Sequence, residues 1–316
     1  MSARPRLALT VGDPRGIGPE IVAAALADPA LRAACDVVVV GPRGMRELAL
    51  VDADVGPWTS GGDAAAAGRL AGRAIEAAVR LALAGEVDGI VTAPIDKAAL
   101  HAGGYDFPGH TEMLARLTGA DVAMMLAADE LGPAGDQALR VVLATTHIAL
   151  RDVPDAVTPA AIARAARVTR GGLRDWFGLA EPRLALCALN PHAGDGGRFG
   201  REDEEVLAPA ARACGLLGPF PADTVFVRAL RGEFDAVVAP YHDVGMTAIK
   251  VAAFGRAVNV TLGLPFPRTS PDHGTALDIA GRGLADPSSF RQAVLSCARI
   301  AARLRVRRAD PAHAVG

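Results

Sequence analysis

The sequence predicts an α/β protein with a mostly parallel sheet and helices on both faces of it. Short, β-branched and almost continuously apolar runs alternate with amphipathic helical stretches from end to end, which is typical of βαβ units. With 316 residues, 51% of them hydrophobic, the chain is long and apolar enough for two domains or one large α/β unit.

The strand-like runs are recognised by their apolar, β-branched character and by the glycines, prolines and polar residues that bound them. In chain order they cover residues 7–13, 36–41, 87–95, 122–128, 139–147, 183–191, 235–242 and 257–263. The runs at 122–128 and 139–147 are separated by a polar turn and are expected to pair as a hairpin.

Helices are expected between these runs, where apolar residues recur with helical spacing. They cover 19–34, the alanine-rich stretch 63–84, a helix opening at 110–111, residues 159–177, residues 202–214 and two helices after residue 273. Thr158 is the expected N-cap of the fourth of these helices, because its hydroxyl accepts a backbone N–H in the first turn.

Composition excludes several classes of partner. The net charge of −2 argues against nucleic acid and against an anionic membrane surface. Apolar stretches stay short of the roughly 18 residues that a membrane span needs, and the N-terminus lacks the apolar core of a secretory signal. The four scattered cysteines lack metal or disulfide spacing, so free thiols and a cytoplasmic location are expected.

Three histidines each follow one of the predicted strands: His147, His192 and His242. In open α/β sheets, ligands bind outside the carboxyl ends of the strands. A single histidine after a strand is most often a loop or core residue. Three histidines in the same context favour one shared metal or substrate site about as strongly as they favour that simpler interpretation. Imidazole suits zinc, cobalt, nickel and iron.

Three glycine-containing segments are further candidates. Gly12–Glu20 joins the first strand to the first helix with more glycines than a plain turn needs, which favours a ligand-lining role, although its spacing is not the dinucleotide fingerprint. His110 and Thr111 open a helix whose N-terminus would suit a phosphate, but an ordinary threonine cap is the simpler reading. Asn190–Asp203 has the length and polarity of a functional loop.

The last third of the chain holds more polar candidates. Asp243 follows His242 and could ligate a metal or orient a ligand, while Lys250 could bind phosphate or act as a base. Asn259 and Arg268 flank a strand end, and arginine binds phosphate or carboxylate with two parallel hydrogen bonds. His273 to Asp278 is expected to form a loop that opens a helix, with Asp278 placed to accept bonds from a ribose diol.

Lysine occurs only at Lys97 and Lys250, whereas arginine supplies every other basic position. Lysine and arginine are exchangeable at most solvated sites, but arginine cannot replace lysine where a compact or deprotonatable amine is needed. The two lysines are therefore better functional candidates than lysines in an average chain.

Taken together, the motifs GDPRGIGPE, GHTE, TTH, LNPHAGDGG, PADTVF, YHD and NVTLGLPF…HGTALDIAGRG resemble the PdxA family of 4-hydroxythreonine-4-phosphate dehydrogenases, in order and over nearly the whole chain. GIGPE and HGTALDIAGRG also resemble the wider isocitrate and isopropylmalate dehydrogenase fold. The resemblance implies two α/β/α domains with an active-site cleft between them, formed by residues 1–118 with 258–316 and by residues 119–257.

The resemblance also implies an activity. The family uses NAD and one divalent metal (Zn, Mg or Co) to oxidise 4-phosphohydroxy-L-threonine to a β-keto acid, which loses carbon dioxide to give 3-amino-1-hydroxyacetone phosphate for pyridoxal phosphate biosynthesis. The family's metal ligands match His147, His192 and His242, one of them from the partner subunit of a homodimer. Its substrate-binding positions match His110, Thr111, Lys250, Asn259 and Arg268. The cofactor-binding positions match Gly16, His273, Gly274, Ala276 and Asp278. Lys250 and Asp243 are candidates for proton transfer, and the base stays open.

Some positions depart from the family pattern. Val244 replaces a glutamine, no proline precedes Lys250, Asp96 replaces an asparagine, and the hairpin at 129–138 is longer than usual. The retained motifs predict that the metal and phosphate sites survive, whereas the changed loop after His242 leaves the exact substrate open. D-threonate or D-erythronate 4-phosphate is an alternative substrate, whereas an aromatic cis-diol fits poorly with a retained phosphate site. A phosphate acyltransferase of related fold is a distant alternative, and a catalytically dead binding protein would require the loss of a ligand or phosphate anchor, none of which is missing.

Overall fold

A computed structural model describes residues 4–131, 135–253 and 255–309. The chain divides into two compact units, Met1–Ala120 with Leu264–Gly316, and Asp121–Gly263. The sequence-based boundaries placed 258–263 in the first unit. That segment carries β10 (Val258–Leu262), which pairs antiparallel with β5 (Ala123–Leu131) and so lies in the sheet of the second unit.

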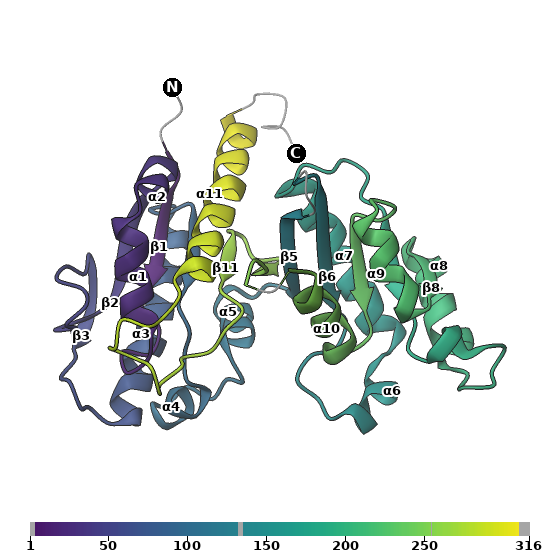
Figure 1. Ribbon diagram of the computed structural model, residues 1–316, viewed down its shortest axis with the longest axis horizontal. Helices are drawn as coiled ribbons and strands as arrows, with labels where there is room; N and C mark the ends of the chain where they lie inside the picture. The colour runs from purple at the N-terminus through teal and green to yellow at the C-terminus, as the bar shows by residue number, and fades with distance from the viewer. Residues whose placement is uncertain (1–3, 132–134, 254, 310–316) are drawn as a thin grey trace. The chain divides into compact units, whose positions relative to one another are not determined.

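The first unit contains a wholly parallel group of strands (Figure 1). Their order is β3-β2-β1-β4-β11. The strands are β1 (Arg6–Thr10), β2 (Asp36–Arg43), β3 (Ala53–Pro57), β4 (Gly89–Thr92) and β11 (Arg268–Ser270). β1 and β4 are buried almost throughout, which explains why their sequences read as continuous apolar runs rather than as alternating ones.

Helices of the first unit form two groups. One group contains α1, α2 and α11, which contact one another, and the other contains α3 with α4 and α5 packed against it. Their bounds are α1 (Gly18–Ala27), α2 (Pro29–Ala34), α3 (Ala64–Leu83), α4 (Lys97–Ala102), α5 (His110–Thr118) and α11 (Ser288–Ala309). Asp63 caps α3 as a side-chain acceptor for the Ala66 N–H, at 2.6 Å.

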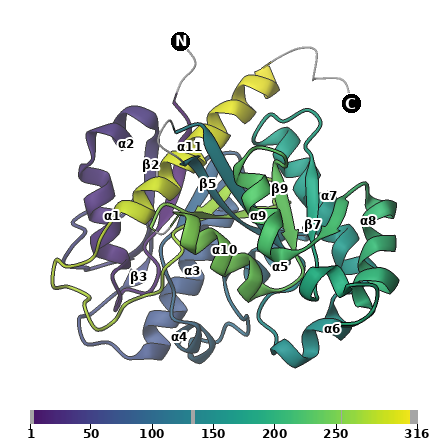
Figure 2. The same ribbon diagram turned by 45° about the vertical axis from the view of Figure 1, so that its right-hand side comes forward.

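The second unit contains a mixed sheet, whose strands β5, β7 and β9 are labelled in the rotated view of Figure 2. The strand order is β10-β5-β6-β9-β7-β8, with β10–β5 and β5–β6 antiparallel and the remaining pairs parallel. The new strands are β6 (Gln137–Leu143), β7 (Leu184–Cys187), β8 (Leu217–Phe220) and β9 (Ala236–Ala239). The expected β5–β6 hairpin is confirmed; residues 132–134 of its longer turn lie outside the described part of the chain.

The two faces of this sheet are covered by different helices. One hydrophobic cluster joins Met124, Leu126 and Ala128 of β5 to residues of α9 (Ala222–Leu230) and α10 (His242–Ala253). A second pair of helices consists of α7 (Pro159–Asp175), which packs against β5 and β10, and α8 (Ala208–Cys214), which contacts α7. Short turns complete the unit: η1 (Leu150–Asp152), α6 (Val153–Ala156), η2 (Pro191–Gly194) and a π-turn, η3 (Asp203–Leu207). Thr158 caps α7 through the Ala161 N–H, as expected.

Two helix predictions are wrong. The stretch 19–34 is two helices, because Asp28 precedes Pro29, takes the extended backbone that a residue before proline favours, and caps α2. Only one helix, α11, follows residue 273 among the described residues. The segment 273–285 is a series of turns, because the Glu20 carboxylate accepts the N–H groups of Gly281 and Ala285 and Ala276 has a left-handed φ of 43°.

The fold class is confirmed, as are the free thiols: Cys35, Cys187 and Cys297 are buried and Cys214 is partly buried. Val244, one of the departures from the family pattern, packs against the hydrophobic cluster of the second unit. Within the described ranges, no helix combines the length and the apolar character required to cross a bilayer.

Candidate functional site

A positively charged group lies in the first unit, where β4, β11, α4 and α5 begin or end. Arg268, the first residue of β11, is 2% exposed and donates from Nη2 to the Thr92 hydroxyl at 2.5 Å. Burial lowers the pKa of this guanidinium to about 10, and nearby Glu112 opposes that shift. The group is still protonated at neutral pH, so β11 holds a buried positive charge.

His110 lies beside this charge, at the first position of α5. Its Nε2 is buried without a hydrogen-bond partner in the described structure. Burial lowers the pKa of His110 well below its ordinary value, and the positive charges of Arg268 and Lys97 lower it further. The imidazole is therefore neutral at physiological pH, and a neutral ring still has one N–H to donate to an anion.

Gly109 is the N-cap of α5, with an extended φ of 176°, and no side chain caps this helix. The simpler reading of Thr111 as an ordinary cap is therefore wrong: Thr111 is the second residue of the first turn. The first backbone N–H groups of α5 therefore remain available to an anion, and such free N–H groups are what allow a helix N-terminus to bind phosphate.

Lys97 is a member of this group that the motif analysis did not include among the site residues. It is the first residue of α4, and a Cβ placed on Gly109 would lie 3.7 Å from its Cε. The scarcity of lysine in the chain marked Lys97 as a functional candidate, but no motif assigned it to a site.

Two of the three predicted metal ligands lie together in the second unit. The ring centroids of His147 and His242 are 5.7 Å apart. Asp243 Oδ1 lies 2.7 Å from Nδ1 of His242, which orients that ring and leaves Nε2 for a ligand. Both rings line a cavity of about 120 Å³ with Thr146, Tyr241 and neighbouring apolar residues. His242 is the first residue of α10 rather than a loop residue.

His192 does not join this pair within one chain. It lies in the turn after β7, is exposed, and has its ring centroid 6.3 Å from that of Phe199. Among the residues that the structure describes, no group of three or more histidine, cysteine or acidic side chains is arranged to hold a metal ion. Within a single chain, the structure therefore brings together two of the three predicted ligands and not the third.

The other candidates of the second unit lie on two elements. Lys250 is half-buried on α10, two turns beyond His242. Asn259 is on β10, with its Nδ2 3.5 Å from the Met124 sulfur and its Oδ1 buried without a hydrogen-bond partner in the described structure.

The predicted cofactor residues lie in two loops of the first unit that touch. The Ile17 N–H donates to the Thr275 carbonyl at 2.9 Å, and a Cβ on Gly16 would come within 2.8 Å of the same oxygen, so only glycine allows this approach. Ala276 is left-handed, and Asp278 is exposed. Glu20 fixes the far end of the second loop through Gly281 and Ala285.

A cavity of about 480 Å³ opens beside these loops. It is lined by Gly16, Trp58, Gly281 and three charged residues: Arg15, Arg46 and Glu47, among others. Its size is in the range of small-molecule sites, and glycine walls let a ligand approach the backbone. Gly16 is the one predicted cofactor residue among its lining residues. Trp58 was missed because its sequence context gives no signal, and Glu20 lay in a candidate segment but was given no role of its own.

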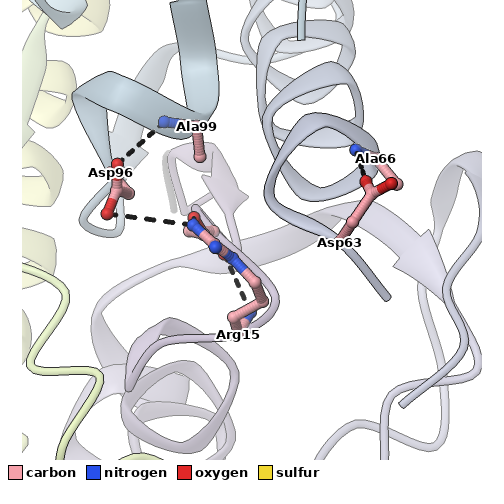
Figure 3. Close-up of polar contacts among 6 residues, drawn as sticks. Arg15, Asp63, Ala66, Asp96 and Ala99 are labelled. Carbon is pink, nitrogen blue, oxygen red and sulfur yellow. Dashed lines mark hydrogen bonds and ion pairs between the residues drawn. The ribbon is translucent and has the colours of Figure 1, made fainter. Parts of the chain in front are cut away.

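Arg15 braces the first of these loops. Its guanidinium donates to both carboxylate oxygens of buried Asp13, which raises the pKa of Arg15, and lies 3.8 Å from Asp96 Oδ2. Figure 3 shows Arg15 directed at Asp96, which also caps α4 through the Ala99 N–H at 2.8 Å. The aspartate that departs from the family pattern therefore has a structural role here, as a cap and as a partner of Arg15.

Comparison with known proteins gives one consistent family. The family model described as pyridoxal phosphate biosynthetic protein PdxA matches residues 19–297. A 4-hydroxythreonine-4-phosphate dehydrogenase from Stenotrophomonas maltophilia (strain R551-3) is 43% identical over 328 residues, 94% of this chain and 98% of its own. The crystal structure of 4-hydroxythreonine-4-phosphate dehydrogenase from Klebsiella pneumoniae has a TM-score of 0.79 at 40% identity, covering 94% of this chain and 99% of that one. The resemblance drawn from the sequence motifs is confirmed.

More distant structures share the fold. A terephthalate 1,2-cis-dihydrodiol dehydrogenase from Burkholderia xenovorans LB400 has a TM-score of 0.64 at 30% identity, with 93% of this chain and 98% of that chain covered. An isocitrate dehydrogenase from Methylococcus capsulatus (TM-score 0.54, 17% identity) and a branched-chain phosphotransacylase from Enterococcus faecalis V583 (0.58, 13%) are similar in fold alone.

Proposed function

The chain belongs to the PdxA family of pyridoxal phosphate biosynthetic proteins, and from this premise we propose that it oxidises 4-phosphohydroxy-L-threonine with NAD. A hydride leaves the carbon that bears the secondary hydroxyl and reduces NAD to NADH, while the hydroxyl proton passes to a base. The resulting β-keto acid loses carbon dioxide and takes up a proton, giving 3-amino-1-hydroxyacetone phosphate.

The single observation that carries the proposal is the pairing of neutral His110 with buried Arg268. A phosphate would receive a charge-assisted bond from Arg268, an N–H from His110 and the free N–H groups at the start of α5, with Lys97 adding positive charge. The buried positive charge of Arg268, with His110 and Lys97 beside it, matches the negative charge of a phosphate, so this group favours a phosphorylated substrate over an unsubstituted aromatic diol.

The histidine pair suits a divalent metal. Two imidazoles, one of them oriented by a carboxylate, form a donor set that favours zinc or cobalt over magnesium, which prefers oxygen ligands. When bound, such a metal supplies Lewis-acid stabilisation of negative charge on the substrate oxygen. Asp243 holds His242 in one orientation, and we assign proton acceptance to Lys250, the half-buried amine on the same helix.

A homodimer would complete the ligand set. Since His192 is exposed and does not join His147 and His242 within one chain, His192 of a second copy is the third ligand in our proposal. Two-fold symmetry then gives two equivalent shared sites, each made from the pair of one chain and the single histidine of the other.

The cofactor NAD is assigned to the loops around Gly16 and 273–278, with the neighbouring cavity of about 480 Å³ large enough for part of a dinucleotide. The four thiols are free, so we place the enzyme in a reducing cytoplasm.

The deciding experiment measures NADH formation by zinc- or cobalt-loaded protein with 4-phosphohydroxy-L-threonine and with D-threonate 4-phosphate in parallel. A strong preference for the first supports the proposal. A preference for the second would make the chain a sugar-acid phosphate dehydrogenase with the same site. Equal turnover of a non-phosphorylated analogue would remove the phosphate role from His110 and Arg268.

A further inference from the structure

The turn that carries His192 has an unusual backbone. His192, Ala193 and Asp195 have φ values of 55°, 56° and 44°, and Gly194 between them has a φ of 85°. Left-handed backbone costs free energy in residues other than glycine, and it persists where the surroundings determine it. Three such residues around one glycine therefore need an external constraint.

Hydrogen bonds inside the turn do not supply that constraint alone. The Ala193 N–H donates to the Asn190 carbonyl at 3.1 Å, and the Gly197 and Phe199 N–H groups donate to the Gly194 carbonyl. All these bonds join residues of the turn to one another. They give it a compact shape but do not fix it to the sheet.

Asp203 ties the turn to the rest of the unit. Its side chain is buried, at 2% exposure, and its two oxygens accept the N–H groups of Leu189 and Asn190 at 2.8 and 2.9 Å. These two residues lie between β7 and His192. The adjacent Glu202 accepts from the Asn190 side chain at 2.8 Å. The two carboxylates thus clamp the chain just before His192.

The clamp closes at the other end of the same loop. Asp203 is the first residue of the π-turn η3, which leads into α8, and α8 packs against α7. A Cβ on Gly194 would lie 2.9 Å from the Gly200 carbonyl oxygen and 3.9 Å from Asp203 Oδ2, so the middle of the loop also rests against Asp203. π-turns within helices occur frequently at functional sites.

We infer that Asp203, assisted by Glu202, is the positioning residue that holds the 190–200 turn and thereby sets the place of the exposed His192 imidazole. The importance of that place rests on the proposed function, in which His192 is a metal ligand. The clamp itself does not rest on it. An acidic residue that merely favoured the helix N-terminus would face the first turn of its own helix, whereas Asp203 faces backbone donors thirteen and fourteen residues earlier.

The test compares Asp203→Asn with the matched control Glu204→Gln, which removes one negative charge from the exposed neighbouring position. The first readout is hydrogen exchange of the backbone amides in metal-free protein. We expect faster exchange at Leu189, Asn190 and the following turn in Asp203→Asn alone, because one of the two N–H acceptors is replaced by a donor. Unchanged exchange there overturns the inference.

The second readout is Zn²⁺ affinity, measured by competition with a chelating dye. Loss of a supporting hydrogen-bond partner typically weakens metal binding by roughly 10- to 100-fold. We expect a loss of this order in Asp203→Asn and none in Glu204→Gln. Normal affinity in Asp203→Asn, where His192→Ala does lose affinity, contradicts positioning of His192 by Asp203.

Two further variants separate the possible failures. If His192→Ala itself binds Zn²⁺ normally, the proposed metal role fails, and the exchange experiment still decides whether Asp203 holds the turn. If Asp203→Asn does not fold, Glu202→Ala replaces it, since that variant removes the acceptor of the bond from the Asn190 side chain. Faster exchange confined to 190–200 in Glu202→Ala then supports the clamp, and unchanged exchange contradicts it.

Discussion

His147 and His242 face each other with ring centroids 5.7 Å apart, although one follows β6 and the other opens α10. The two positions meet because β6 and β9 are parallel neighbours, with Leu143 paired to Ala239, so that the segments after both strands emerge at the same edge of the sheet. His192, in the turn after β7, lies beside Phe199 and does not join this pair within the same chain.

Mixed dimers test whether the third histidine comes from a second copy. His192→Ala and His242→Ala should each lose the metal and turnover while remaining folded. In a mixed dimer of the two variants, one site would combine an intact pair with an intact His192. Random exchange of equal amounts should therefore restore about a quarter of wild-type activity. Complete inactivity of verified mixed dimers would place all three ligands in one chain.

Arg268→Gln should weaken the binding of phosphorylated substrate by about 2–4 kcal/mol, because a buried charged contact to the phosphate is lost. The effect should appear mainly in KM. Arg116→Gln, at an exposed position of α5, is the matched control and should change little. A similar loss with a non-phosphorylated analogue would argue against a phosphate contact.

The stability of the first unit should depend on pH through His110. Burial holds the pKa of His110 below its ordinary value of 6.5, so the unfolded chain binds the proton more readily. The contribution of neutral, buried His110 to the free energy of unfolding is fully present above pH 6.5. It is lost as the pH falls from there toward the folded-state pKa, because protonation then favours the unfolded chain. Urea unfolding between pH 5 and 8 should show a shallower decline in the free energy of unfolding for His110→Gln than for wild type.

Asp63→Ala should destabilise the first unit by about 1 kcal/mol, the usual cost of removing a helix N-cap. The Asp63 carboxylate accepts the Ala66 N–H at 2.6 Å, as drawn in Figure 3. Asp63→Asn keeps an acceptor and should remain close to wild type. Urea denaturation measures both, and equal stability of the two variants would contradict the cap assignment.

Glu20→Gln should loosen the loop that carries the cofactor candidates, since charge-assisted bonds to Gly281 and Ala285 are replaced by weaker ones. We expect KM for NAD to rise by roughly 5- to 30-fold, corresponding to about 1–2 kcal/mol, with a smaller effect on kcat. Glu86→Gln, at an exposed position, is the control. Unchanged KM together with faster amide exchange at 281–285 would separate this loop from the cofactor site.

Local signals explain which elements were predictable. α7 begins where Thr158 and Pro159 indicate, and the β5–β6 hairpin follows from two apolar runs around a polar turn. The break between α1 and α2 was missed because alanine-rich periodicity continues across Asp28, although the following proline marks it. The Glu20 carboxylate accepts a backbone N–H from a segment more than 250 residues later, and that N–H is then not available to a helix. No local sequence pattern reveals this contact.

The same contrast holds for the site. Histidines after strands and an arginine beyond a strand end were identifiable because their positions follow from the alternation of strands and helices. That Arg268 itself begins a strand was not predicted. The sequence marked Lys97 as a candidate and Asp203 as the end of a functional loop, but it gave no role to either residue or to Trp58. Their neighbours are brought near only by the folded chain. The separation of His192 from His147 and His242 within one chain is likewise a property of the fold, which spacing along the sequence does not encode.

The discontinuous first unit has a consequence for synthesis on the ribosome. The second unit, Asp121–Gly263, is one continuous stretch, so its whole sheet is available to pair before the C-terminal segment has been translated. The first unit lacks β11 and α11 until the final fifty or so residues emerge, as its buried Arg268 and the inner face of α11 come from that segment. The edge of β4 that pairs with β11 therefore stays unpaired until that segment is made, and we expect a truncation before β11 to destabilise the unit that is made first.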